Sequence, residues 1–171
     1  MGQRANLLIV ENAQYQLFHS NWCANTLPRD LFWGPEYAVR FIRMQSEVGE
    51  SGWLDDVWAE GGAVVDLDKQ NLLLFGGEDV HCDIPLRRVY LELLSRTWNT
   101  WDIQWAYEGI AAIADYVGYP RIKVLSTRTK EGVPIFSLPA QEEKRDAEIV
   151  ASIQWAAEQI RLYPLRGDPE D

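Results

Sequence analysis

Residues 63–75 read AVVDLDKQNLLLF and give the clearest structural pattern in the chain. Two apolar runs, Ala63–Leu67 and Asn71–Phe75, flank a polar turn at residues 68–70, as is typical of a β-hairpin. The second run is apolar without alternation, which indicates a strand that is buried on both faces. We therefore expect this hairpin to lie at the centre of a sheet.

A second hairpin is expected nearer the N-terminus. Residues Ala5–Glu11 and Tyr15–Ser20 have the composition of two strands around a turn at residues 12–14. Each hairpin is followed by a loop and then by a helix that opens with a proline, Pro35 in the first unit and Pro85 in the second. The chain is therefore expected to contain two ββα units. If these units lie side by side in one sheet, their loops meet at one end of it, but the sequence leaves open whether the two loops are adjacent.

Apolar residues at helical spacing predict the helices. A helix is expected from near Pro35, a short helix over about 107–117 and a long helix over about 141–162. One or two helical turns are expected within residues 53–60, and their inward residues are Trp53, Leu54, Val57 and Trp58. A further helix, capped by Asp83, is expected from Ile84 to about Trp98, and its inward residues are Leu86, Val89, Tyr90, Leu93 and Leu94. Further strands are expected at 101–106, at Ile122 and Val124, and at 133–136.

These elements predict an α+β fold in a single domain over residues 1–162. The sheet is expected to be largely antiparallel, with the two ββα units packed by helices and a long helix at the C-terminal end. Residues 163–171 are expected to be a flexible tail. A chain of 171 residues is long enough for one sizeable core.

Composition restricts the class of partner. The net charge of −10 repels phosphate backbones and anionic lipid, so nucleic acid and membrane surfaces are not expected partners. The N-terminus does not resemble an export signal, and no apolar run is long enough to span a bilayer. We therefore expect a soluble, cytoplasmic protein in which both cysteines are reduced. The chain also contains eight tryptophans, which is unusual for its length.

The two loops after the hairpins contain all the histidines and cysteines of the chain. His19 and Cys23 belong to the first loop, and His81 and Cys82 belong to the second. Zinc is not expected. His81 and Cys82 are adjacent, so in an extended chain their side chains point in opposite directions, and the spacing of His19 and Cys23 matches no zinc motif. No cofactor is predicted either.

Nucleophilic chemistry is one interpretation of these loops. A cysteine, Cys82 or Cys23, would be activated by His19 or His81, with Asp79 orienting the imidazole. Cysteine is also among the residues most often buried as a small hydrophobe, and this is the simpler interpretation. The sequence leaves open whether the protein is an enzyme.

Binding is the other interpretation. Trp22 and Trp33 lie in loops, where an exposed aromatic side chain is a common anchor for a partner. Cys23, Asn25 and Glu78 complete the predicted binding residues. The leading hypothesis is an acidic cytosolic interaction module that binds a cationic protein, as immunity and antitoxin-like proteins do. The alternative is a cysteine-dependent hydrolase or transferase that uses the cluster of His19, Cys23, His81 and Cys82.

Overall fold

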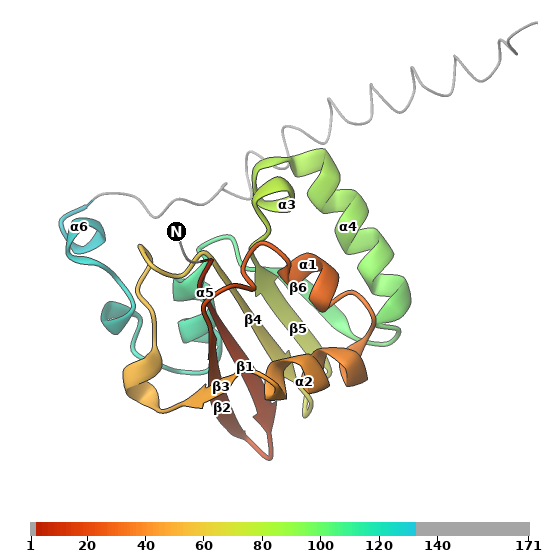
Figure 1. Cartoon of the computed structure of the whole chain (residues 1–171), viewed down its shortest axis with the longest axis horizontal. Helices are drawn as coiled ribbons and strands as arrows, with labels where there is room; N and C mark the ends of the chain where they lie inside the picture. Colours follow the sequence, from red (N-terminus) through yellow and green to blue (C-terminus); the bar gives the residue numbers. More distant parts are fainter. Residues whose placement is uncertain (1–2, 133–171) are drawn as a thin grey trace, which may run out of the picture. The chain divides into compact units, whose positions relative to one another are not determined.

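The computed structural model of the chain describes residues 3–132, which fold around a six-stranded sheet (Figure 1). The strands are β1 (Ala5–Glu11), β2 (Gln14–Ser20), β3 (Ser46–Val48), β4 (Gly61–Asp66), β5 (Asn71–Phe75) and β6 (Asp102–Trp105). The helices are α1 (Leu27–Asp30), α2 (Pro35–Arg43), α3 (Glu78–Cys82), α4 (Ile84–Thr97), α5 (Ile110–Tyr116) and α6 (Thr127–Lys130), with two 3₁₀ turns, η1 (Glu50–Gly52) and η2 (Arg121–Lys123). Both predicted hairpins and the helices that begin at Pro35 and Ile84 are confirmed.

The sheet is mixed, so the expectation of a largely antiparallel sheet was wrong. Its strand order is β3-β2-β1-β4-β5-β6. The two hairpins lie side by side through their first strands, and β1 and β4 run parallel, with Leu7 opposite Ala63. Strand β6 is parallel to β5 because the chain crosses over through α3 and α4 between them. Two of the five strand pairings are therefore parallel.

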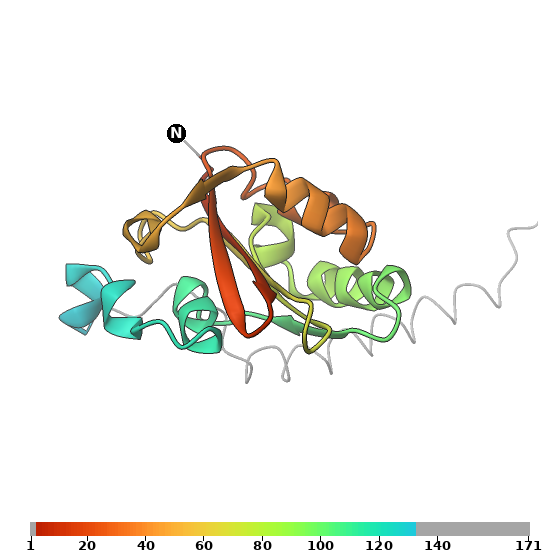
Figure 2. The same cartoon turned by 90° about the horizontal axis from the view of Figure 1, so that it is seen from below.

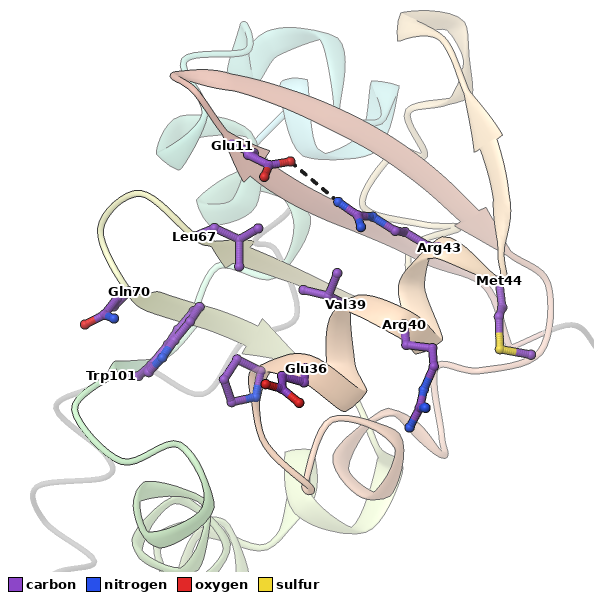
Figure 3. A pocket seen from close by; sticks show the side chains of 10 residues that line it. Glu11, Glu36, Val39, Arg40, Arg43, Met44, Leu67, Gln70 and Trp101 are labelled. Atoms are coloured by element: carbon purple, nitrogen blue, oxygen red, sulfur yellow. Dashed lines mark hydrogen bonds and ion pairs between the residues drawn. The ribbon is translucent and has the colours of Figure 1, made fainter.

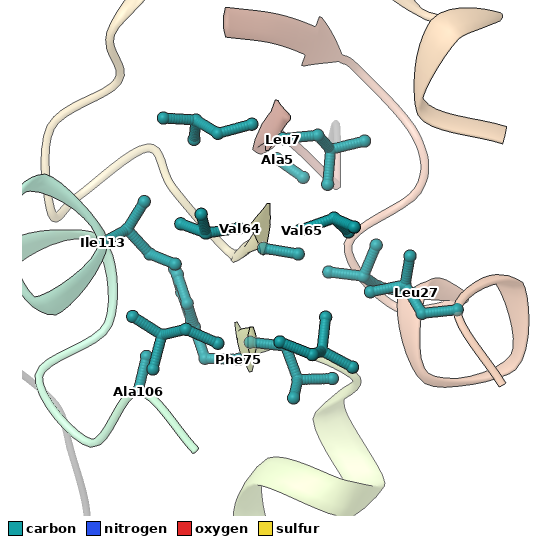
Figure 4. Close-up of a cluster of buried hydrophobic side chains, with 14 of the residues drawn as sticks. Ala5, Leu7, Leu27, Val64, Val65, Phe75, Ala106 and Ile113 are labelled. Carbon is teal, nitrogen blue, oxygen red and sulfur yellow. The ribbon is translucent and has the colours of Figure 1, made fainter. Parts of the chain in front are cut away.

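Helices cover both faces of the central strands, with α2 and α5 on opposite sides (Figure 2). Alternate residues of β4 point to opposite faces, so Val64 lies toward Ile113 of α5 and Val65 toward Leu27 of α1 (Figure 4). Every residue of β4 and β5 is buried, as the unbroken apolar run of residues 71–75 predicts.

Helix α4 is the longest described helix and lies in the middle of the chain. The carboxylate of Asp83 accepts the Leu86 N–H at 2.8 Å, which confirms the predicted cap. Trp98, at the C-terminal end of the helix, is fully buried, and its indole N–H donates to the Leu31 carbonyl oxygen at 2.8 Å. This bond ties α4 to the end of α1.

The residues of α4 that face the core differ in part from the predicted set. Tyr90 and Leu94 face the core as expected, but Leu86, Val89 and Leu93 are more than 40% exposed. Arg87 faces inward instead, and its buried guanidinium donates to the His81 carbonyl oxygen at 2.9 Å.

Five other expectations either differ from the structure or fall outside the described residues. Residues 53–60 do not form a helix, since the side chain of Asp55 accepts the N–H groups of Val57 and Trp58 and holds a turn instead. Ile122 belongs to the 3₁₀ turn η2 and not to a strand. The expected strand at 133–136, the helix at 141–162 and the tail at 163–171 lie outside residues 3–132. No helix within residues 3–132 has the length and apolar character needed to cross a membrane.

Candidate functional site

The loops that follow the two hairpins are in direct contact, an arrangement that the sequence alone left open. The Gly77 N–H donates to the Ala24 carbonyl oxygen at 2.8 Å. A Cβ on Gly77 would lie 2.5 Å from Cγ of Pro28, and a Cβ on Gly76 would lie 3.0 Å from the Ala24 oxygen. Both glycines have positive φ, 124° at Gly76 and 74° at Gly77, so the close approach of the loops requires glycine at both positions.

A third segment, residues 55–60, lies at the same end of the sheet. The N–H of Glu60 donates to the Arg4 carbonyl oxygen at 3.0 Å, just before β4 begins. We call the surface formed by residues 21–26, 55–60 and 76–83 the loop edge. It lies where β1 and β4 begin and where β2 and β5 end, near α1 and α3 in Figure 1.

The two histidines have different surroundings at the loop edge. Nε2 of His19 lies 3.1 Å from the side-chain oxygen of Asn21. The ring of His81, on α3, lies 6.3 Å from the ring of Trp105, measured between centroids. Burial, assisted by the positive charge of Arg87, lowers the pKa of His81, so this imidazole is neutral at pH 7.

The two cysteines are also separated by environment. Cys23 belongs to the hydrophobic core, and burial raises the pKa of its thiol, which disfavours the thiolate that a nucleophile needs. Cys82 is exposed and is the last residue of α3, next to the helix-capping Asp83. Asp79 is exposed on the first turn of α3. Within residues 3–132, no three His, Cys, Asp or Glu side chains are placed to hold a metal ion.

The predicted binding residues lie mostly on the surface. Trp22 is 70% exposed, Asn25 is exposed on the same loop, and Glu78 is exposed at the start of α3. Trp33 is 63% exposed but lies between α1 and α2, where its ring meets that of Phe32 edge to face. The loop edge therefore contains Trp22, Asn25 and Glu78, whereas Trp33 belongs to another part of the surface.

One aromatic residue of the loop edge was not expected there. Trp58 was predicted to face the core, yet it is 54% exposed, and the guanidinium of Arg4 lies 4.5 Å from the centre of its ring. Asp55 is the feature of the sequence that could have identified this exposure, because an aspartate side chain can accept the backbone N–H groups that follow it and so favours a turn over a helix.

The loop edge is strongly acidic. Its three segments contain six Asp or Glu residues and no Lys or Arg. These carboxylates are Asp55, Asp56, Glu60, Glu78, Asp79 and Asp83. Partial burial alone would raise the pKa of Asp56, but hydrogen bonds from Thr129 and Ser126 outweigh it and the pKa lies below its ordinary value. A negative charge is therefore fixed at this position at neutral pH.

A pocket of 210 Å³ opens at the loop edge. It is lined by Asp56, Val57, Ala59, Glu60, Phe75, His81, Gly109 and Ile110. The lining combines two carboxylates, one neutral imidazole and an apolar set of side chains. Such a combination suits a ligand that carries both a positive charge and an apolar part.

A larger groove of 820 Å³ lies at the opposite end of the sheet, beside α2 (Figure 3). Val39, Leu67 and Trp101 form its apolar part. Its charged side chains are of both signs, and Glu11 pairs with Arg43 at 3.5 Å. The groove was not predicted, because it joins one helix to turns that are distant in the sequence. The groove does not share the excess of acidic side chains found at the loop edge.

Comparison of the chain with protein-family models, with curated proteins and with solved structures found no match.

Proposed function

We propose that this chain is an acidic, cytosolic protein-interaction module that binds a cationic protein through its loop edge, in the manner of immunity and antitoxin-like proteins. One observation carries the proposal: two exposed tryptophans, Trp22 and Trp58, lie on the same surface as six carboxylates. Tryptophan is enriched among the residues that dominate binding energy, and a surface on which acidic side chains predominate steers an oppositely charged partner.

The charge of the whole chain supports the same proposal. A net charge of −10 adds a long-range attraction for a basic protein, and this attraction weakens as salt is added. The tryptophans supply the part of the binding energy that is insensitive to salt. Binding that combines both contributions is expected to persist, with lower affinity, at high ionic strength.

The test is affinity capture from an extract of the native cell on the immobilised full chain, at low and at high salt. A loop-edge variant carries Trp22→Ala, Glu78→Gln and Asp79→Asn. A matched control carries Trp33→Ala, Glu47→Gln and Glu50→Gln, three exposed residues elsewhere. We expect a basic protein to be retained by the native chain and by the control, and to be lost by the loop-edge variant. Retention by the loop-edge variant, or no specific capture at any salt concentration, contradicts the proposal.

The alternative function is that of a cysteine-dependent hydrolase or transferase. It depends on Cys82, because Cys82 is exposed whereas Cys23 is buried in the core. An exposed thiol beside the N-cap of α4 is the one observation that favours it. Its test is the reactivity of that thiol, which separates an activated nucleophile from an ordinary surface cysteine.

A further inference from the structure

We propose that the 210 Å³ pocket of the loop edge binds the side chain of a lysine presented by the partner. This inference rests on the proposed function and specifies the chemical group that the loop edge recognises. A lysine side chain joins an apolar four-carbon stem to a compact ammonium group. The pocket offers matching surroundings for both parts.

The apolar part of the pocket suits the lysine stem. Phe75, Ile110 and Ala59 are buried residues of the core that line the cavity. Gly109 also lines the cavity, and a Cβ at this position would contact the Phe75 ring at 3.5 Å. A methylene stem placed there would remove apolar surface from water on both sides.

The carboxylates of the pocket suit the ammonium group and are already held in position. Oδ1 of Asp56 accepts the Ser126 N–H at 2.5 Å, and Oδ2 accepts the Thr129 hydroxyl. Oε2 of Glu60 accepts the Arg4 N–H at 2.9 Å. Groups that are fixed before binding lose little conformational freedom when the ligand arrives. The neutral imidazole of His81 adds no opposing positive charge.

The neighbourhood of Trp58 explains why lysine fits better than arginine. A guanidinium group binds well when it stacks on an aromatic face, and the exposed ring beside the pocket already carries the guanidinium of Arg4 at 4.5 Å. A second guanidinium would have to displace it. An ammonium group needs no aromatic face, because it interacts with the carboxylates as a point charge.

The test is an NMR titration of the full chain with Nα-acetyl-lysine N-methylamide. Two matched probes serve as controls: the norleucine amide lacks the ammonium group, and the arginine amide carries a guanidinium group in its place. We expect the lysine probe to shift the amide signals of residues 57–60 and Gly109, and to bind at least threefold more tightly than either control. Glu60→Gln is expected to weaken binding by about threefold to tenfold, because the amide oxygen still accepts a hydrogen bond but the negative charge is lost.

Two further variants keep the test decisive. Glu50→Gln, an exposed acid away from the pocket, should leave the affinity unchanged. Val57→Lys, at the exposed mouth of the pocket, should weaken binding because its own ammonium competes. Equal binding of norleucine, or shifts that avoid the pocket residues, would overturn the inference. If the captured partner is lost by the loop-edge variant but bound normally by Glu60→Gln, the proposed function stands and the lysine pocket does not.

Discussion

The backbone N–H of Gly77 donates a 2.8 Å hydrogen bond to the carbonyl oxygen of Ala24. This bond joins the loops that follow the two hairpins, of which one carries Trp22 and the other leads into α3. The loop edge exists as one surface because these loops are held together at a point where only glycine fits.

Gly77→Ala is expected to lower the free energy of unfolding by about 2–4 kcal/mol. The substitution forces a side chain into a positive-φ conformation and places its Cβ 2.5 Å from Pro28. Urea denaturation measures the effect. Gly118→Ala is the matched control, because Gly118 also has a positive φ but no atom lies within 4 Å of the added Cβ. We expect it to cost about 1 kcal/mol, and equal losses for the two variants would contradict the packing role of Gly77.

Asp68→Ala is expected to destabilise the chain by about 1–3 kcal/mol. The carboxylate of Asp68 accepts the N–H groups of Asn12 at 3.0 Å and of Ala13 at 2.7 Å, so the turn of one hairpin holds the turn of the other. Losing two charge-assisted hydrogen bonds accounts for the cost. Thermal unfolding measures the effect, with Glu50→Ala as the control variant. An unchanged midpoint for Asp68→Ala would show that these hydrogen bonds contribute nothing to stability.

Asp56→Asn is expected to change how stability depends on pH. Hydrogen bonds from Thr129 and Ser126 keep the folded-state pKa of Asp56 below the value of an unfolded chain. The carboxylate therefore contributes stability above its unfolded pKa, and this contribution is lost as the pH falls through the folded pKa. The asparagine variant has no such group to titrate.

The difference in unfolding free energy between the native chain and Asp56→Asn should consequently be largest at neutral pH and shrink from about pH 5 downward. Urea denaturation at a series of pH values measures it, with Glu50→Gln as the variant that removes a charge elsewhere. A difference that stays constant from neutral pH to acid would show that Asp56 is not stabilised as a carboxylate.

Thiol alkylation should label Cys82 and spare Cys23 in the folded protein. Cys23 is buried and its pKa is raised, so it becomes reactive only when the chain opens. Cys82→Ser should leave no rapidly reacting thiol until urea is added. Rapid labelling of Cys23 in the native state would contradict its place in the core. If Cys82 reacted much faster in the folded chain than in urea, the enzyme alternative would gain support over the interaction module.

Local sequence patterns were sufficient for most elements but not for their arrangement. The strand Asn71–Phe75 and the capped helix from Ile84 follow from patterns of neighbouring residues. The parallel pairing of β1 with β4 does not, because it depends on which strand edges meet after both hairpins have formed. Arg87 shows the same limit within a helix, since its inward position depends on carbonyl groups of the preceding α3.

The candidate site was also predictable only in part. The repeated layout of hairpin, loop and helix predicts the two loops, but their contact depends on the pairing of β1 with β4, which the sequence did not specify. The apolar residues at helical spacing in residues 53–60 predict a helix there, and Asp56 and Glu60 would lie on the outer face of such a helix. The turn formed by Asp55 removes that helix, and Gly109 and Ile110 complete the pocket from a distant part of the chain.

The most direct test of the binding surface is hydrogen–deuterium exchange of the full chain with and without its captured partner. The loop edge is predicted to become protected in the complex, at residues 21–26, 55–60 and 76–83, while residues 35–44 of the opposite groove exchange as in the free chain. Protection of residues 35–44 with no change at the loop edge would contradict the account.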